Sequence, residues 1–440
     1  MRSLLLLLGI PLLLFPMDVQ AQYILSEMMD TTTNKGKLLN KQFGDKDQLR
    51  FSGYIQPQFQ WAESKGISTY NGGDFSTNSN NRFMFRRARL KTEYAHYTTS
   101  GKLQSQLVFQ IDGTERGIAM RDLWGRLYEN KLELFSLTIG LFPRPMGYEV
   151  MYSSSDRETP ERGRMSQILM KTERDIGAML TIDPRKSSYR WKNLLRFDIG
   201  VFNGQGLTST TDFDSHKDVI SRITIKPQLL NKQGWTITGG LSAYYGGMVN
   251  RGPWLYQTKE TNGNFSVVGD SSNHNMNSVA PRHYLGADFQ FKIPRKKWHT
   301  EVRGEYIKGK QTSRATSSET PSSYPMTSNN VLLPLYIRNF DGAYFYFLQH
   351  LGSNQLQLLV KYDWYDPNTK VSGKTISSTN GFSTADIRYS TLGTGFIYHI
   401  SPFLKAVLYY DHVTNETTRI TGFDKDLADD VLTVRLHYRF

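Results

Sequence analysis

The chain contains 440 residues, carries a formal net charge of +13 and has no cysteine. The lack of cysteine excludes a disulfide framework, a cysteine-rich zinc site and an acylated lipoprotein cysteine. A positive charge of this size favours an anionic partner, such as nucleic acid, an acidic membrane surface or an anionic substrate. Tyrosine and phenylalanine are abundant, with 25 and 24 copies, as is typical of pleated surfaces and membrane interfaces.

The N-terminus predicts a secretory signal peptide over residues 1–21. Arg2 precedes an apolar run at 4–15, and small side chains precede a cleavage point after Ala21. An N-terminal anchor helix is the alternative, but the run is shorter than the roughly 18 apolar residues that a spanning helix needs. No later apolar stretch reaches that length, so we expect an exported mature protein without a transmembrane helix. The polar residues 22–48 predict a periplasmic N-terminal segment.

Segments with a period of two residues predict strands throughout the rest of the chain. The sixteen candidates are 49–62, 82–97, 101–112, 118–129, 131–142, 174–183, 190–202, 218–230, 234–247, 283–293, 297–309, 341–350, 354–365, 386–399, 402–412 and 429–440. Most of them exceed the usual strand length of about 5–6 residues. They are long enough to cross a bilayer at a tilt, which takes about 9–11 residues.

The connections between these segments alternate in length. Long connections, such as 63–81 and 143–173, are separated by short ones such as 98–100 and 231–233. This alternation is typical of a barrel with tight periplasmic turns and larger outer loops. We therefore predict an all-β fold, a sixteen-stranded antiparallel transmembrane β-barrel of the porin type, over residues 49–440.

Alternation within the strands supports the barrel. One face of segment 49–62 is apolar, formed by Leu49, Phe51, Ile55, Phe59 and Trp61. The other face carries amides and an arginine. A β-sandwich also alternates, but the length and number of the strands and the pattern of connections favour a barrel. The last segment ends in Phe440 and resembles the C-terminal strand of bacterial outer-membrane barrels.

Three motifs resemble a known family of membrane proteins. They are NRFMFRRARLKTEY at 81–94, IGLFPRPMGYEVMYSSSDRETPERGRM at 139–165 and NGQG at 203–206. With these motifs the chain resembles the phosphate-selective porin O and P family over essentially the whole barrel. The resemblance implies an outer-membrane porin, usually a homotrimer, whose third outer loop folds into the lumen and narrows the pore. That loop corresponds to 143–173 here, and Met146 stands where the family more usually has phenylalanine.

Segment 82–97 combines a strand period with a cluster of cations. One face, which we expect to line water inside the barrel, carries Arg87, Arg89 and Lys91. The opposite face, which we expect to meet lipid, carries Met84, Ala88, Leu90 and Tyr94. Arg86 falls on the lipid-facing side, where a charge near the bilayer midplane costs about 2–4 kcal/mol. A β-bulge or a position near the membrane interface would accommodate it.

Further cations are candidates for binding anions or lining the pore. They are Arg126, Arg196 and Arg222 on other strands, and Arg144, Arg157, Arg162 and Arg164 in the third outer loop. A cationic excess in a narrow pore concentrates anions, and the planar guanidinium can bond two phosphate oxygens at once. The alternative for each single cation is a pair with a nearby carboxylate, such as Asp156, Glu158 or Glu161. The expected anion preference therefore rests on the sum of the charges.

The resulting hypothesis is a passive, anion-preferring porin of the cell outer membrane, with phosphate or phosphorylated small solutes as cargo. We expect lipid, small anions and further copies of the chain as partners, and no enzymatic activity, cofactor, metal or nucleic acid. NTKVSGKT at 368–375 ends like a phosphate-binding loop, but it lacks the first glycine and lies in a predicted outer loop. Two alternatives stay open. One is a general pore for nutrients such as small sugars, and the other is an enzyme or adhesin built on a barrel.

Overall fold

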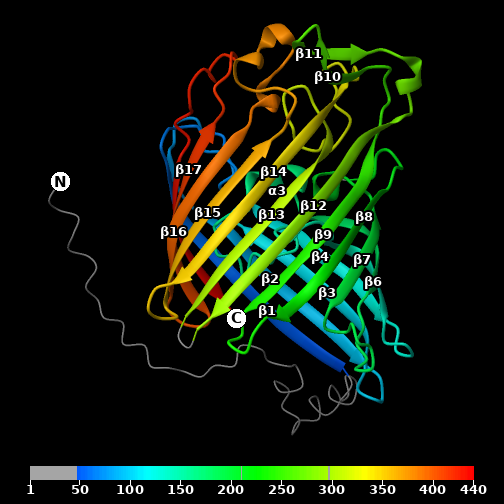
Figure 1. Ribbon diagram of the computed structural model, residues 1–440, viewed down its shortest axis with the longest axis vertical. Coiled ribbons are helices and arrows are strands. Elements are labelled where there is room, and N and C mark those ends of the chain that lie inside the picture. The colour runs from blue at the N-terminus through cyan, green and yellow to red at the C-terminus, as the bar shows by residue number, and fades with distance from the viewer. Residues whose placement is uncertain (1–46, 210, 296–297) are drawn as a thin grey trace, which may run out of the picture.

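The computed structural model describes residues 47–209, 211–295 and 298–440. The predicted signal peptide, 1–21, and nearly all of the predicted segment 22–48 lie outside the described residues. The described chain forms one barrel whose strands run obliquely to its long axis (Figure 1).

The barrel wall is closed and antiparallel throughout, with β1 pairing both to β2 and to β18. Its sixteen strands are β1 (Asp47–Ala62), β2 (Asn81–Tyr97), β3 (Leu103–Thr114), β4 (Gly117–Tyr128), β5 (Phe135–Pro143), β6 (Arg174–Ile182), β7 (Leu195–Phe202), β8 (Asp218–Leu229), β9 (Thr236–Val249), β12 (Val279–Pro294), β13 (His299–Ser313), β14 (Leu335–His350), β15 (Leu356–Asp366), β16 (Tyr389–His399), β17 (Leu404–Asn415) and β18 (Val431–Arg439). The predicted sixteen-stranded barrel is confirmed.

A hairpin outside the wall was not predicted. Strands β10 (Leu255–Thr261) and β11 (Asn264–Asp270) lie within the long connection between β9 and β12, which we expected to be a loop. Asn262 and Gly263 join them with φ angles of 53° and 77°, the left-handed conformation that a two-residue hairpin turn requires. The hairpin pairs through β10 with the start of β14 and lies at the upper end of the barrel in Figure 1.

Helical structure is confined to short pieces among the described residues. They are α3 (Arg164–Leu169) and the 3-10 turns η1 (Gly206–Thr208), η2 (Asn273–Asn275), η3 (Gly373–Thr375), η4 (Ser378–Asn380) and η5 (Thr384–Asp386). Within the described ranges, no helix combines the length and the apolar character needed to cross a membrane.

The outer face of the wall is apolar and the alternation predicted for β1 is confirmed. Phe51 and Trp61 are exposed, whereas Gln58 and Gln60 on the other face are buried. Exposed apolar side chains recur on strands around the barrel, from Phe83 on β2 to Leu436 on β18. A band of this kind suits contact with lipid, because the hydrophobic effect disfavours leaving so much apolar surface in water.

Arg86 occupies a β-bulge in β2. A bulge was one of the two explanations for a charged residue on the side of the strand that we expect to meet lipid. Gln56 of β1 pairs with Arg87 and the adjacent Pro57 pairs with Phe85, so Arg86 has no partner in the ladder. The extra residue exchanges the two faces of the strand. Met84 therefore lies opposite the buried Gln58, on the inner face. The expectation that Met84 meets lipid is wrong because it assumed an unbroken period of two.

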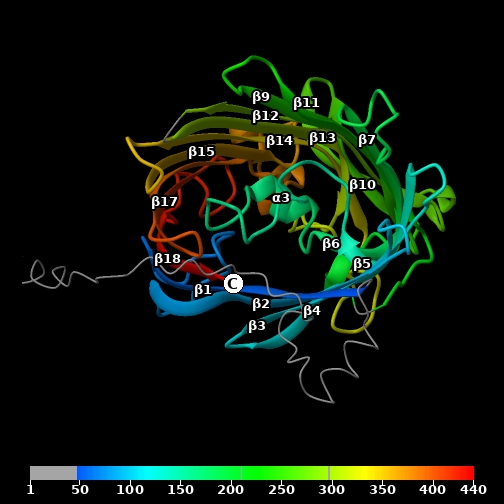
Figure 2. The same ribbon diagram turned by 90° about the horizontal axis from the view of Figure 1, so that it is seen from below.

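The connection 144–173, called the luminal segment below, packs against one side of the barrel interior. Helix α3 belongs to it and lies inside the ring of strands in Figure 2. Its buried Met165 and Ile168 form one apolar cluster with wall residues that include Tyr244 of β9 and Tyr344 of β14. The inner face on that side is thus partly apolar, where the sequence predicted a polar lining.

Candidate functional site

The luminal segment is anchored to the wall strands β9, β13 and β14. The backbone N–H of Gly147 donates to Ser242 Oγ at 3.0 Å. The backbone N–H groups of Tyr148 and Glu149 donate to Glu305 Oε2 at 2.9 and 3.0 Å. Tyr344 also donates its hydroxyl to this oxygen, at 2.7 Å. These bonds fix the start of the segment against the apolar side of the interior.

Gly147 is required at this anchor for two reasons. Its φ of +67° lies in the left-handed region, and a Cβ there would overlap Glu305 Oε1. We expect Gly147→Ala to release the start of the luminal segment and to increase its cleavage by trypsin in the detergent-purified protein. Gly73→Ala is the matched control, because Gly73 has φ +100° and nothing within 4 Å of the added Cβ. Equal cleavage of the two variants would contradict this anchor.

On the opposite side, Glu161 of the luminal segment meets four arginines. Arg86 Nε donates to Glu161 Oε1 at 2.7 Å, and Arg87 Nη2 donates to Oε2 at 2.8 Å. Arg435 of β18 lies at 3.1 Å and Arg157 at 4.0 Å. Burial alone would raise the pKa of Glu161, but the arginines outweigh it and hold that pKa well below its ordinary value. Glu161 therefore stays ionised and ties the segment to β2 and β18.

Glu173, at the end of the luminal segment, is a second such centre. It forms ion pairs with Arg121 at 2.7 Å, with Arg162, and with Arg174 at 3.4 Å. Arg174 also pairs with Asp122 of β4 at 3.1 Å. Burial acts to raise the pKa of Glu173, and the three arginines again hold that pKa well below its ordinary value.

Two β-bulges supply arginines to these centres. Arg86 reaches Glu161 from the bulge in β2. In the β3–β4 pair, Gln110 lies opposite Asp122 and Ile111 opposite Met120, so Arg121 is also left out of the ladder. Its guanidinium then reaches Glu173. Arg121 is not among the residues predicted from the sequence. The sequence pattern that indicates this bulge is a pair of adjacent charged residues, Arg121 and Asp122, inside an alternating strand. Arg86 and Arg87 show the same pattern.

These residues form one arginine-rich region, called the arginine cluster below. Within the described residues it comprises three groups of ion pairs, around Glu161, around Glu173 with Asp122, and between Arg89 and Asp112. Together they contain eight arginines and four carboxylates: Arg86, Arg87, Arg89, Arg121, Arg157, Arg162, Arg174 and Arg435 with Asp112, Asp122, Glu161 and Glu173. Among these groups the arginines outnumber the carboxylates by four. The cluster joins the luminal segment to strands β2, β3, β4, β6 and β18, across the interior from the apolar side.

The structure brings four of the ten candidate cations into the arginine cluster, namely Arg87, Arg89, Arg157 and Arg162. Lys91 follows on β2 and pairs with Glu93 at 2.8 Å. Arg144 is buried and donates to the backbone carbonyl of Glu173 at 3.4 Å. Arg164 stacks on aromatic rings in a separate cavity, described further below.

The other three candidates take no part in the ion pairs of the cluster and have their own partners. Arg126 donates to Thr138 Oγ1 at 2.7 Å. Arg196 pairs with Asp198 at 2.9 Å. Arg222 pairs with Asp288 at 2.5 Å. Local pairing, the alternative considered for each single cation, thus describes most of the ten.

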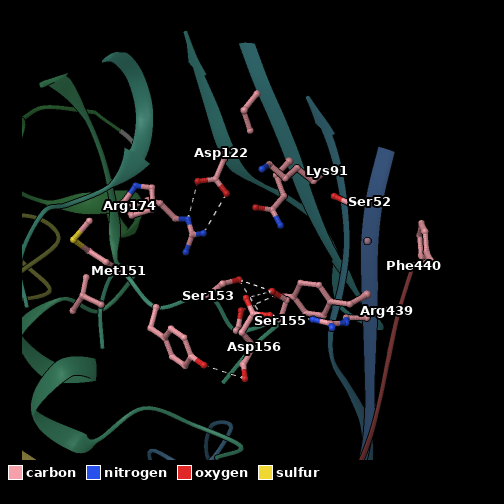
Figure 3. A pocket seen from close by; sticks show the side chains of 18 of the residues that line it. Ser52, Lys91, Asp122, Met151, Ser153, Ser155, Asp156, Arg174, Arg439 and Phe440 are labelled. Carbon is pink, nitrogen blue, oxygen red and sulfur yellow. Dashed lines mark hydrogen bonds and ion pairs between the residues drawn. The ribbon is translucent and has the colours of Figure 1, made fainter. Parts of the chain in front are cut away.

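Cavities lie on both sides of the luminal segment. The larger one, of about 970 Å³, is lined by Lys91, Arg174, Arg439 and Asp122 and reaches the C-terminal Phe440 (Figure 3). It is called the inner cavity below, because Phe440 lies at the barrel end with the short connections. Within the described ranges, no group of three histidine, aspartate or glutamate side chains is placed to hold a metal ion.

Comparison with solved structures identifies proteins of the same fold. An anion-selective porin from Comamonas acidovorans superposes with a TM-score of 0.53 at 8% identity, covering 90% of this chain and 100% of that one. The outer membrane channel DcaP of Acinetobacter baumannii gives a TM-score of 0.51 at 10% identity, covering 90% and 98%. Neither a family model nor a curated protein matches the sequence. The barrel therefore shares the fold of bacterial outer-membrane porins.

Proposed function

We propose that the protein is a channel of the bacterial outer membrane through which small anions diffuse in preference to cations. The observation that carries this proposal is the arginine cluster, in which eight arginines share four carboxylates beside the luminal segment. A narrow passage beside unbalanced positive charge attracts anions and repels cations. Passage is by diffusion and involves no catalytic step.

The apolar exterior supports the membrane location and an oligomer. Exposed side chains on β2 to β5, such as Phe83, Phe85, Leu123 and Ile139, form an apolar surface beside the arginine cluster. The outer connection between β3 and β4 consists only of 115–116, so no bulky loop covers this side. We place the contact between three copies of the chain here, with lipid around the rest of the wall.

Phosphate is the proposed preferred anion, as in the family that the sequence resembles. Lys91 and Arg439 line the inner cavity, where their donors can meet an oxyanion. Arg174 lines the same cavity, but its guanidinium is bonded to Asp122 and Glu173 and contributes its charge only. Arginine suits this role because its planar fork can bond two phosphate oxygens. Asp122 and Asp156 line the same cavity. These two carboxylates limit the affinity of the cavity for phosphate, because they repel its negative charge.

Current measurements in planar bilayers test this proposal. With chloride as the main carrier, we expect added phosphate to reduce the single-channel current, because a bound oxyanion occupies the passage. Lys91→Gln should weaken this block several-fold, whereas Arg116→Gln, an exposed outer-turn control, should leave it unchanged. Chloride current without any phosphate block would favour a general nutrient pore. Absence of conductance in the purified protein would favour the enzyme or adhesin alternative.

A further inference from the structure

A second cavity, of about 570 Å³, lies on the other side of the luminal segment. It is called the outer cavity below, because several of the long connections line it. Its floor includes Arg164 at the start of α3, and its walls include Tyr70, Tyr389 and Asp429. The rest of the lining is mixed: Ile67, Ile168, Ile387 and Leu427 are apolar, and Lys65 and several serine and threonine residues are polar. The volume lies within the range of small-molecule sites, about 300–1,000 Å³.

Arg164 differs from the arginines of the cluster. Its guanidinium lies over the ring of Tyr389 at 3.7 Å and that of Tyr70 at 4.9 Å. Among the described residues, no carboxylate forms an ion pair with it. Stacking holds the flat faces of a guanidinium and leaves N–H groups on its edge able to donate. The arginine is therefore positioned for an anionic group that the chain itself does not supply.

Within the part of the chain that the structure describes, Arg164 is a cation without a carboxylate partner, and Asp429 is a buried carboxylate without a bonded cation. Its residue is only 5% exposed, and Oδ1 has no hydrogen-bond partner among the described residues. Burial raises its pKa to about 7; Arg164 acts against that rise, and Asp426, Asp430 and Glu63 add to it. Buried charged oxygens without partners are costly, and a native structure rarely keeps them without a role.

We propose that the outer cavity binds a small zwitterion of the α-amino acid class, whose carboxylate pairs with Arg164 and whose ammonium group pairs with Asp429. A cation and a carboxylate line one cavity but do not pair with each other, so each can take the opposite charge of one ligand. The apolar part of the lining, with Ile67, Ile168, Ile387 and Leu427, accommodates an aliphatic side chain. A simple anion such as phosphate fits less well here, because Asp429 and its acidic neighbours would repel it.

This inference goes beyond the proposed function, since binding at the outer cavity does not require conduction. The two can fail separately: phosphate block of a current tests the channel, and equilibrium binding to the purified protein in detergent tests the outer cavity. A zwitterion held at the outer end would be positioned to enter the barrel from outside.

Calorimetric titration of the full chain with leucine at pH 8 is the first experiment. We expect saturable binding, and at least tenfold weaker binding of 4-methylpentanoate, which lacks the ammonium group, and of isopentylamine, which lacks the carboxylate. These comparisons use the unmodified protein, so no variant has to fold. Equal binding of either half-analogue overturns the proposal. So does the failure of all twenty proteinogenic amino acids to bind at 10 mM.

Variants identify the two charges. Asp429→Asn and Arg164→Gln should each weaken leucine binding at least tenfold. Asp424→Asn, which removes an exposed acid from the same connection, should leave it unchanged. Unchanged leucine binding by the Asp429→Asn and Arg164→Gln proteins would overturn the assignment.

The pH dependence gives an independent readout of Asp429. Its pKa of about 7 means that the carboxylate is charged above that pH and protonated below it. Binding should therefore weaken about tenfold from pH 8 to pH 6. The charged groups that act on Asp429 are Arg164, Glu63, Asp426 and Asp430. The dependence should disappear in Asp429→Asn, and its persistence there would assign the titration to another group.

Discussion

Replacing Glu161 with glutamine is expected to detach the luminal segment from β2 and β18 and to destabilise the protein by about 3–5 kcal/mol. The glutamine keeps the shape of the side chain but removes the charge that balances Arg86, Arg87 and Arg435. These arginines would then repel one another in a buried site. Unfolding in urea measures the loss of stability. Single-channel conductance should rise, because a displaced segment obstructs the lumen less.

Asp156→Asn is the matched control for this change. It removes one negative charge from the same segment, but Asp156 pairs with Arg439 at the wall of the inner cavity, where both side chains are about half exposed to solvent. Exposed pairs of this kind contribute about 0–1 kcal/mol. If Glu161→Gln were as stable as Asp156→Asn, the arginine cluster would not hold the segment.

Replacing both Arg87 and Arg89 with glutamine is expected to lower the anion-to-cation permeability ratio roughly fourfold. Each unit charge, acting across about one Debye length of electrolyte near 0.1 M salt, changes the permeability ratio by about a factor of two. Both arginines are nearly fully buried, yet their charges still contribute to the excess of the cluster. Reversal potentials in a salt gradient give the ratio.

Two comparisons make this second result interpretable. Arg116→Gln removes a cation from the exposed outer turn between β3 and β4, with 74% of its side chain exposed, and should leave the ratio nearly unchanged. The effect of the double variant should also shrink as the salt concentration rises, since counter-ions screen the field. A ratio equal to that of the unmodified protein would show that strand β2 does not set selectivity.

The barrel could be predicted from the sequence because its signals are local. A period of two fixes which side chains of a strand share a face, and the alternation of long and short connections fixes the topology. The strands β1 and β18 show this most simply, with glutamines or arginines facing inward and aromatic or aliphatic side chains facing outward.

Bulges and the filled interior were harder to predict. A bulge shifts the period by one residue, which misplaced Met84 and concealed Arg121. The apolar inner wall can be recognised in the sequence, because the strands that form it are apolar on both faces. In β14, Tyr344 and Tyr346 are buried while Phe345 and Phe347 are exposed. That pattern indicates a partner inside the barrel as well as lipid outside.

The sequence predicted candidate cations but not their partners. Arg87 of β2 and Arg157 of the luminal segment do come together, but the carboxylate that they share is distant in sequence from the strand. Glu161 and Arg435, for example, are 274 positions apart. No periodicity within one strand reports such contacts across the lumen. The same reason concealed the outer cavity, where Arg164 and Asp429 come from different connections.

The reversal potential of the unmodified protein in a potassium chloride gradient tests the central claim most directly. If the unbalanced charge of the arginine cluster governs the passage, the zero-current potential lies on the chloride side and moves further toward the chloride equilibrium potential at low salt. A potential of zero, or one on the potassium side, would contradict an anion-preferring channel.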